Sequence, residues 1–105
     1  MVPNTLVLRY TFTMSGITFV GSAARHGYTQ EDAVQAMLHP VHGPLERPSR
    51  TSQTTVMLWV GPPVRPDSLV PLIEVLADRR GQTLVIFHVM AVQQQTLDLF
   101  TVTPD

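Results

Sequence analysis

Three apolar runs decide the fold of this chain: TTVMLWVG at Thr54–Gly61, LVPLIEVLAD at Leu69–Asp78 and TLVIFHVMAV at Thr83–Val92. They are rich in the β-branched and apolar residues that can form a core, which favours strands. A proline-rich segment separates the first two runs, and Arg79-Arg80-Gly81-Gln82 separates the last two. The pattern predicts three antiparallel strands, with a long first connection and a hairpin loop over Asp78–Gln82.

Pro71 is the one residue in these runs that opposes a strand, because proline cannot donate a hydrogen bond to a neighbour. It indicates either an edge position for the second strand or a strand that begins at Leu72. The sequence leaves both possibilities open.

The N-terminal part of the chain contains two further candidate strands. Leu6–Met14 alternates apolar and polar residues with period two, and a short apolar piece, Ile17–Val20, follows the turn signal Ser15-Gly16. Gly21–His26 then predicts one or two helical turns, which end at Gly27.

The clearest helix signal lies at Gln30–His39. Thr29 is a favourable N-cap, Asp32 stands three residues later, and Pro40 ends the helix. The polar, turn-rich segment 41–53 is interpreted as a loop, and Gln93–Phe100 as a short C-terminal helix. Together these elements predict one α+β domain over residues 1–105. It would contain a small antiparallel sheet of three to four strands, two short helices in the N-terminal half and a short C-terminal helix.

Composition excludes several classes of protein. Among 105 residues there is no cysteine, so neither a disulfide framework nor a thiolate metal site is available. The formal net charge of −1 argues against broad electrostatic binding of nucleic acid. No apolar run approaches the roughly 20 residues of a membrane helix, and the N-terminus lacks the pattern of a signal peptide. We therefore expect a cytoplasmic protein with no membrane partner.

Glu74 and His88 are polar residues inside apolar strands and are the leading candidates for chemistry. If the hairpin is centred near residue 80, Glu74 lies opposite Ile86 and diagonal to His88 on the same face. A carboxylate beside an imidazole orients it for acid–base work. A register shift of one residue would place them on opposite faces. The alternative is a hydrogen-bonded core histidine and a solvated glutamate.

Two groups of cations complete the candidate site. Arg25 and His26 lie between the predicted helices, where arginine could bind a phosphate and histidine could act as acid or base. Arg79 and Arg80 at the hairpin tip could bind phosphate together with the loop residues Arg47 and Arg50. For both groups the more common explanation is a set of solvated residues, at a helix end and at a turn. No cofactor motif is present, and we predict no metal site.

The segment Arg25–Ala33 resembles a motif of the BrnT-like toxins, in which a basic residue, His and Gly precede a capped acidic helix. Further similar segments are Leu38–Pro40, Val60-Gly61, Leu72–Val75, Val85–Ala91 and Gln93–Phe100. The resemblance implies a RelE-like ribonuclease fold, metal-independent RNA cleavage that stops translation, and an antitoxin protein as partner. His26, Glu74, His88 and Arg25 would then divide the roles of base, acid and phosphate cation.

A different function class is a non-catalytic protein-binding domain that acts through its sheet, with a homodimer as one form of it. Trp59, Met57 and Met90 would suit such an interface if they were exposed, because interfaces are enriched in aromatic residues and methionine. Convergence of Glu74, His88, His26 and Arg25 on one face would favour the enzyme instead.

Overall fold

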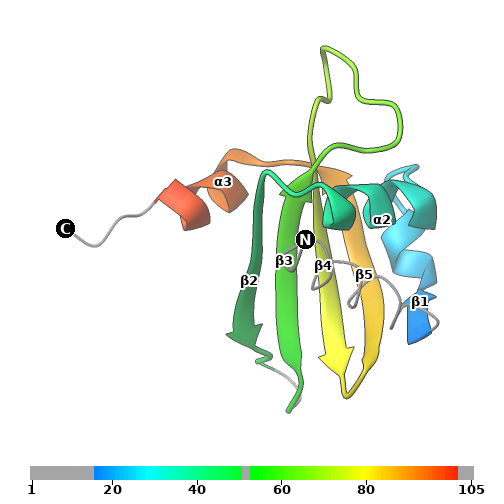
Figure 1. Cartoon of the computed structure of the whole chain (residues 1–105), viewed down its shortest axis with the longest axis vertical. Helices are drawn as coiled ribbons and strands as arrows, with labels where there is room; N and C mark the ends of the chain where they lie inside the picture. The colour runs from blue at the N-terminus through cyan, green and yellow to red at the C-terminus, as the bar shows by residue number, and fades with distance from the viewer. Residues whose placement is uncertain (1–15, 51–52, 102–105) are drawn as a thin grey trace, which may run out of the picture.

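The computed structural model describes residues 16–50 and 53–101 and contains a five-stranded sheet with helical elements around it (Figure 1). The predicted strand Leu6–Met14 lies outside these residues. In chain order the elements are β1 (Ile17–Phe19), the 3₁₀ helix η2 (Gly21–Ala24), α2 (Gln30–Leu38), β2 (His42–Pro48), β3 (Thr55–Gly61), β4 (Ile73–Arg80), β5 (Thr83–Ala91) and α3 (Gln94–Thr101).

The sheet has the order β1-β5-β4-β3-β2 and is mixed. The three predicted strands form an antiparallel meander, β3-β4-β5. The α+β class is confirmed, but the prediction of three to four strands, all antiparallel, is wrong. β1 runs parallel to β5 because η2, α2 and three more strands separate them in sequence, which gives the chain room to return in the same direction.

The interpretation of segment 41–53 as a loop is wrong for its first part. Its first part is β2, which pairs with β3 at the edge of the sheet. Two prolines are tolerated there because an edge strand needs donors on one side only. The pairing is irregular between His42 and Leu45, and Gly43 has φ +99° where a Cβ would collide with the carbonyl oxygen of Leu58.

β4 begins at Ile73, after Pro71, and lies in the centre of the sheet. The later start is therefore correct, and the edge position is wrong. The connection from β3 is long, as predicted. The hairpin between β4 and β5 is tighter than predicted, because Arg80 pairs with Thr83 and leaves only Gly81 and Gln82 in the turn. Gly81 there has φ +64°, which suits glycine.

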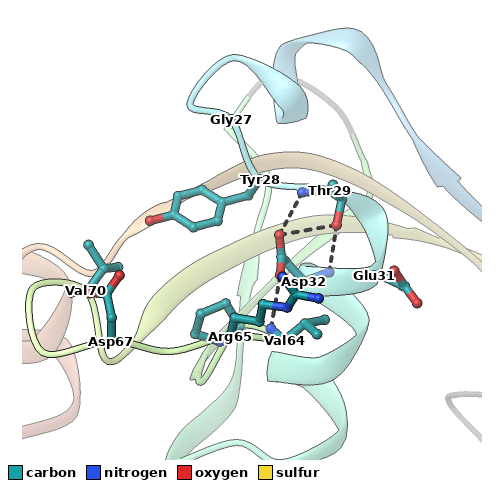
Figure 2. A pocket seen from close by; sticks show the side chains of 10 residues that line it. Gly27, Tyr28, Thr29, Glu31, Asp32, Val64, Arg65, Asp67 and Val70 are labelled. Carbon is teal, nitrogen blue, oxygen red and sulfur yellow. Dashed lines mark hydrogen bonds between the residues drawn. The ribbon is translucent and has the colours of Figure 1, made fainter.

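α2 follows the prediction closely and begins with a complete capping box (Figure 2). The backbone N–H of Thr29 donates to Asp32 Oδ2 at 3.0 Å, and the N–H of Asp32 donates to Thr29 Oγ1 at 3.1 Å. Asp32 Oδ1 also accepts the backbone N–H of Val64 at 2.9 Å. One carboxylate thus holds both the start of the helix and the β3–β4 loop.

α2 packs one face of the sheet, and this contact forms the core. Its buried residues are Ala33, Ala36 and Met37, and they meet alternate residues of the central strands, among them Met57, Trp59, Val75, Ile86 and Val89. Small residues allow a close approach: a Cβ on Gly61 would lie 2.9 Å from the Cα of Ala36.

The short helical turn after β1 and the C-terminal helix are confirmed as η2 and α3. Figure 1 shows α3 on the side of the molecule near β2, away from α2. Within the described residues no helix is both long and apolar enough to cross a membrane.

Candidate active site

Glu74 and His88 lie on the face of the sheet opposite α2, and a β-bulge puts them there. From the turn, Arg80 pairs with Thr83 and Ala77 with Ile86. That register, if continued, would place Glu74 opposite Val89 and His88 on the core face. An extra residue in β5 between Ile86 and His88 changes the register, so that Leu76 pairs with His88 and Glu74 with Met90. The bulge therefore turns His88 towards Glu74 and Val89 into the core.

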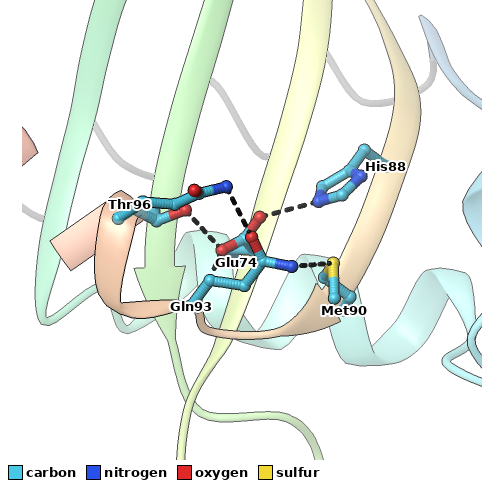
Figure 3. Close-up of polar contacts among 6 residues, drawn as sticks. Glu74, His88, Met90, Gln93 and Thr96 are labelled. Atoms are coloured by element: carbon cyan, nitrogen blue, oxygen red, sulfur yellow. Dashed lines mark hydrogen bonds and ion pairs between the residues drawn. The ribbon is translucent and has the colours of Figure 1, made fainter.

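Sequence reasoning placed Glu74 and His88 diagonally on one face, and the structure confirms this arrangement (Figure 3). His88 Nε2 lies 2.7 Å from Glu74 Oε2. The predicted register was wrong, since Glu74 opposes Met90 rather than Ile86. Both side chains still share a face because the correct register differs from the predicted one by an even number of residues.

Three donors hold Glu74: one in β5, one in α3 and one in the residue directly before α3. Its Oε2 contacts His88 Nε2, and its Oε1 accepts the backbone N–H of Gln93 at 3.0 Å and the hydroxyl of Thr96 at 2.6 Å. The side chain of Glu74 is 5% exposed, whereas that of His88 is 28% exposed. The pair therefore has a buried, fixed carboxylate and an imidazole that solvent reaches.

The charge state of Glu74 follows from these contacts. Burial acts to raise its pKa, but the hydrogen bonds from His88, Thr96 and Gln93 outweigh burial and hold the pKa below the ordinary value of 4.5. Glu74 is therefore ionised at neutral pH and can only accept hydrogen bonds. His88 Nε2 must then carry a hydrogen, which leaves Nδ1 of a neutral His88 as the proton acceptor.

His26 approaches the same pair from the edge of the sheet. β1 covers the edge of β5 only from Leu84 to Ile86. After Ile86 the edge of β5 is contacted by η2 instead, where Ser22 Oγ donates to the carbonyl oxygen of Phe87 at 3.0 Å. The ring centroids of His26 and His88 are 6.3 Å apart, with 70° between the ring planes. Three predicted catalytic residues, distant in sequence, therefore converge.

The predicted phosphate-binding arginines divide into two places. Arg25 is exposed and directly precedes His26. Arg79 and Arg80 end β4, five and six residues from Glu74, which is about 17–20 Å along a strand. They pair with carboxylates: Arg79 Nη1 lies 3.7 Å from Glu46 Oε2, and Arg80 Nη2 lies 3.5 Å from Asp78 Oδ2. The structure does not bring this second pair to the histidines.

A pocket lies between the start of α2 and the β3–β4 loop (Figure 2). It contains none of the predicted catalytic residues. Its lining residues are Gly27, Tyr28, Thr29, Glu31, Asp32, Pro63, Val64, Arg65, Asp67 and Val70. Burial, Asp67 and Asp32 raise the pKa of Tyr28, and hydrogen bonds from Thr29 and Val64 hold the pKa of Asp32 below its ordinary value despite burial. The pocket is acidic and is separate from the histidine cluster.

Sequence reasoning missed two members of the site, Thr96 and Gln93. Both belong to the segment correctly predicted as a C-terminal helix, but nothing in their spacing names Glu74 as the acceptor. Thr96 is the third residue of α3, where a capping box has Glu or Gln rather than a hydroxyl, so no capping signal in the sequence draws attention to it.

Two of the three residues suggested for a protein interface lie in the core. Met57 is 0% exposed and Trp59 is 3% exposed, and both pack in the core below α2. Met90 is half-buried, and its sulfur contacts Gln93 Nε2 at 3.2 Å. Trp59 and Met57 are therefore core residues, and the condition of exposure that an interface requires is not met for them.

Neither the protein-family models, nor the curated proteins, nor the solved structures contain a significant match to this chain. Within residues 16–50 and 53–101, no group of three or more His, Asp and Glu side chains is arranged to hold a metal ion. The geometry of Glu74, His88 and His26 is therefore the feature from which a function can be inferred.

Proposed function

We propose that this chain is a small ribonuclease that cleaves RNA by acid–base catalysis without a metal ion. The observation that carries the proposal is the cluster of two imidazoles with ring centroids 6.3 Å apart, one of them bonded to a buried, ionised glutamate. A carboxylate that orients an imidazole, with a second imidazole nearby, supplies a base and an acid on two sides of one reacting group.

The proposed reaction uses the 2′-hydroxyl of the RNA as nucleophile. His88 Nδ1 takes the proton of this hydroxyl while its oxygen attacks the adjacent phosphorus. Protonated His26 gives a proton to the 5′-oxygen that leaves. The products are a 2′,3′-cyclic phosphate and a 5′-hydroxyl, and one proton is taken up and one returned. Glu74 keeps His88 in the tautomer that this role requires and stabilises its protonated form.

Charge on the phosphate is the second requirement of this reaction. Arg25 is the nearest cation in sequence to His26 and is exposed, so we assign it the non-bridging phosphate oxygens. Arg79 and Arg80 are too far away to contact the same phosphate, and for them contact with more distant phosphates stays a prediction. The net charge of −1 requires that binding depend on such local contacts.

We further propose that the ribonuclease is the toxin of a toxin–antitoxin pair. The support for this step is the resemblance of Arg25–Ala33 to the BrnT-like toxins, together with the position of His26 beside His88. A small antitoxin protein would inhibit the enzyme by covering the face that contains Glu74 and His88. The binding-domain alternative is weaker, because Trp59 and Met57 are buried in the core and cannot contact a partner.

Induced expression in a bacterium tests the toxin proposal. We expect the native chain to arrest growth and to produce RNA fragments with 5′-hydroxyl ends. His88→Ala and His26→Ala should relieve the arrest, because each removes one proton-transfer group. His39→Ala is a matched control, since His39 is exposed at the end of α2 and away from this cluster.

All variants must be compared at equal soluble level. Arrest that persists in both His88→Ala and His26→Ala would contradict the proposed site. Absence of arrest with well-expressed, folded native protein would contradict the toxin assignment in that host and would favour the binding domain.

A further inference from the structure

Thr96 connects the C-terminal helix to the proposed active site. Its hydroxyl donates to Glu74 Oε1 at 2.6 Å, and the side chain is buried. The backbone N–H of Gln93, directly before α3, reaches the same oxygen at 3.0 Å. Glu74 Oε2 faces away from α3 and contacts His88. Oε1 of Glu74 therefore binds the start of α3 and Oε2 binds His88, and Figure 3 shows the contacts on both sides of the carboxylate.

A carboxylate is planar, so fixing one oxygen and its rotation fixes the other. A glutamate side chain has three rotatable bonds, and fixing them in one conformation costs conformational entropy. One hydrogen bond to His88 leaves the carboxylate free to rotate about the axis of that bond. Two donors on Oε1 remove this rotation and direct Oε2 towards Nε2 of His88.

We propose that Thr96 is a positioning residue for the Glu74–His88 pair: it holds Glu74 so that His88 keeps the Nε2–H tautomer and presents Nδ1 as the base. The inference rests on the proposed ribonuclease function for its consequence in catalysis. The tautomer itself is a property of the folded chain and can be measured without any substrate.

A purely structural role for Thr96 would be to attach α3 to the sheet. However, α3 has a second attachment, because the ring of Phe100 stacks on His42 of β2 with centroids 5.0 Å apart and 17° between the planes. The N–H of Gln93 also remains when the Thr96 hydroxyl is removed. Loss of this hydroxyl should therefore affect the orientation of Glu74 more than the docking of α3.

The test compares Thr96→Val, which keeps the shape and removes the donor, with Thr96→Ser, which keeps the donor. The first readout is the ¹⁵N–¹H correlation spectrum of His88 at a pH where the imidazole is neutral, which distinguishes the two tautomers. The second is cleavage of single-stranded RNA, with kcat and KM measured separately. Thr96→Ala serves as a second variant if Thr96→Val does not fold.

We expect the native chain and Thr96→Ser to show the Nε2–H tautomer alone. Thr96→Val should show a mixture with Nδ1–H, and its kcat should fall roughly 10-fold at unchanged KM, as for loss of one hydrogen bond to a charged group. A folded Thr96→Val or Thr96→Ala protein that keeps the single tautomer would overturn the inference. If the native chain cleaves no RNA but Thr96→Val still mixes the tautomers, the positioning role stands and the proposed function fails.

Discussion

Two carboxylates hold helix starts in this molecule by the same chemistry, and they differ in one partner. At α2, Asp32 Oδ2 accepts the backbone N–H and the hydroxyl of Thr29, at 3.0 and 3.1 Å. At α3, Glu74 Oε1 accepts the N–H of Gln93 and the hydroxyl of Thr96. In each case the second oxygen reaches a third segment. For Asp32 that segment is the backbone N–H of Val64, and for Glu74 it is the imidazole of His88.

The difference separates a structural carboxylate from a candidate catalytic one. Every partner of Asp32 is a backbone amide or a hydroxyl, and neither changes its protonation near neutral pH. Glu74 is buried, stays ionised and faces the one kind of side chain that exchanges protons near pH 7. A pocket with acidic walls lies beside Asp32, but the pair of imidazoles lies beside Glu74.

The largest expected effect is on stability. Glu74→Ala should lower the free energy of unfolding by about 3–5 kcal/mol, because it leaves a buried hydroxyl, a backbone N–H and an imidazole without their acceptor. Asp32→Ala should cost about 1–2 kcal/mol, as for loss of a helix cap in a half-exposed position. Urea unfolding with a common m-value measures both. If both variants lost the same free energy of unfolding, the result would contradict the claim that burial makes Glu74 more important for stability than Asp32.

A smaller effect is the loss of folding stability in acid as Glu74 and Asp32 become protonated. The pKa of each carboxyl is lowered in the folded chain, so the unfolded chain binds protons first as the pH falls. The stability from these groups is therefore complete above their ordinary values, 4.5 for Glu74 and 3.8 for Asp32, and is lost as the pH falls towards the folded-state pKa.

Unfolding curves between about pH 6 and pH 2 test this window. Glu74→Gln should remove the part of the loss that begins at the higher pH, and Asp32→Asn the part that begins lower. A native chain whose stability rises as the pH falls below 4.5 would contradict both assignments.

The smallest effect concerns the contact that brings His26 to the Glu74 region. Ser22→Ala removes the hydrogen bond to the carbonyl of Phe87 and should lower stability by about 1 kcal/mol or less, since Ser22 is exposed. RNA cleavage should fall a few-fold, because η2 would hold His26 less firmly near His88. Unchanged cleavage in a variant with measurably weaker protection of η2 amides would show that His26 does not depend on this contact.

Much of the fold could be predicted from sequence because its signals are local. Thr29 and Asp32 mark the start of α2, and the three apolar runs mark the meander. β2 was missed because its proline and glycine residues oppose a strand, and only its edge position in the folded chain makes them acceptable. The parallel pairing of β1 with β5 joins residues far apart in sequence, and no local pattern encodes it.

The prediction that Glu74 and His88 share a face is correct only because the structure departs from the predicted hairpin in two ways that cancel. The turn lies at Gly81-Gln82 rather than around Arg80, and this change alone would put the two side chains on opposite faces. The bulge near Phe87 adds one residue and restores a common face. Alternation along a strand could identify the candidates, but the bulge that joins them comes from the folded sheet.

The most direct measurement is cleavage of a defined RNA oligonucleotide in the presence of a metal chelator, beside the same oligonucleotide with one 2′-deoxy position. The account predicts products ending in 2′,3′-cyclic phosphate and 5′-hydroxyl, no cleavage at the deoxy position, and a loss of about 10²–10⁴-fold in His88→Ala and His26→Ala. His39→Ala should match the native chain. Cleavage that survives both cluster substitutions, or no cleavage by the folded native chain, would contradict the account.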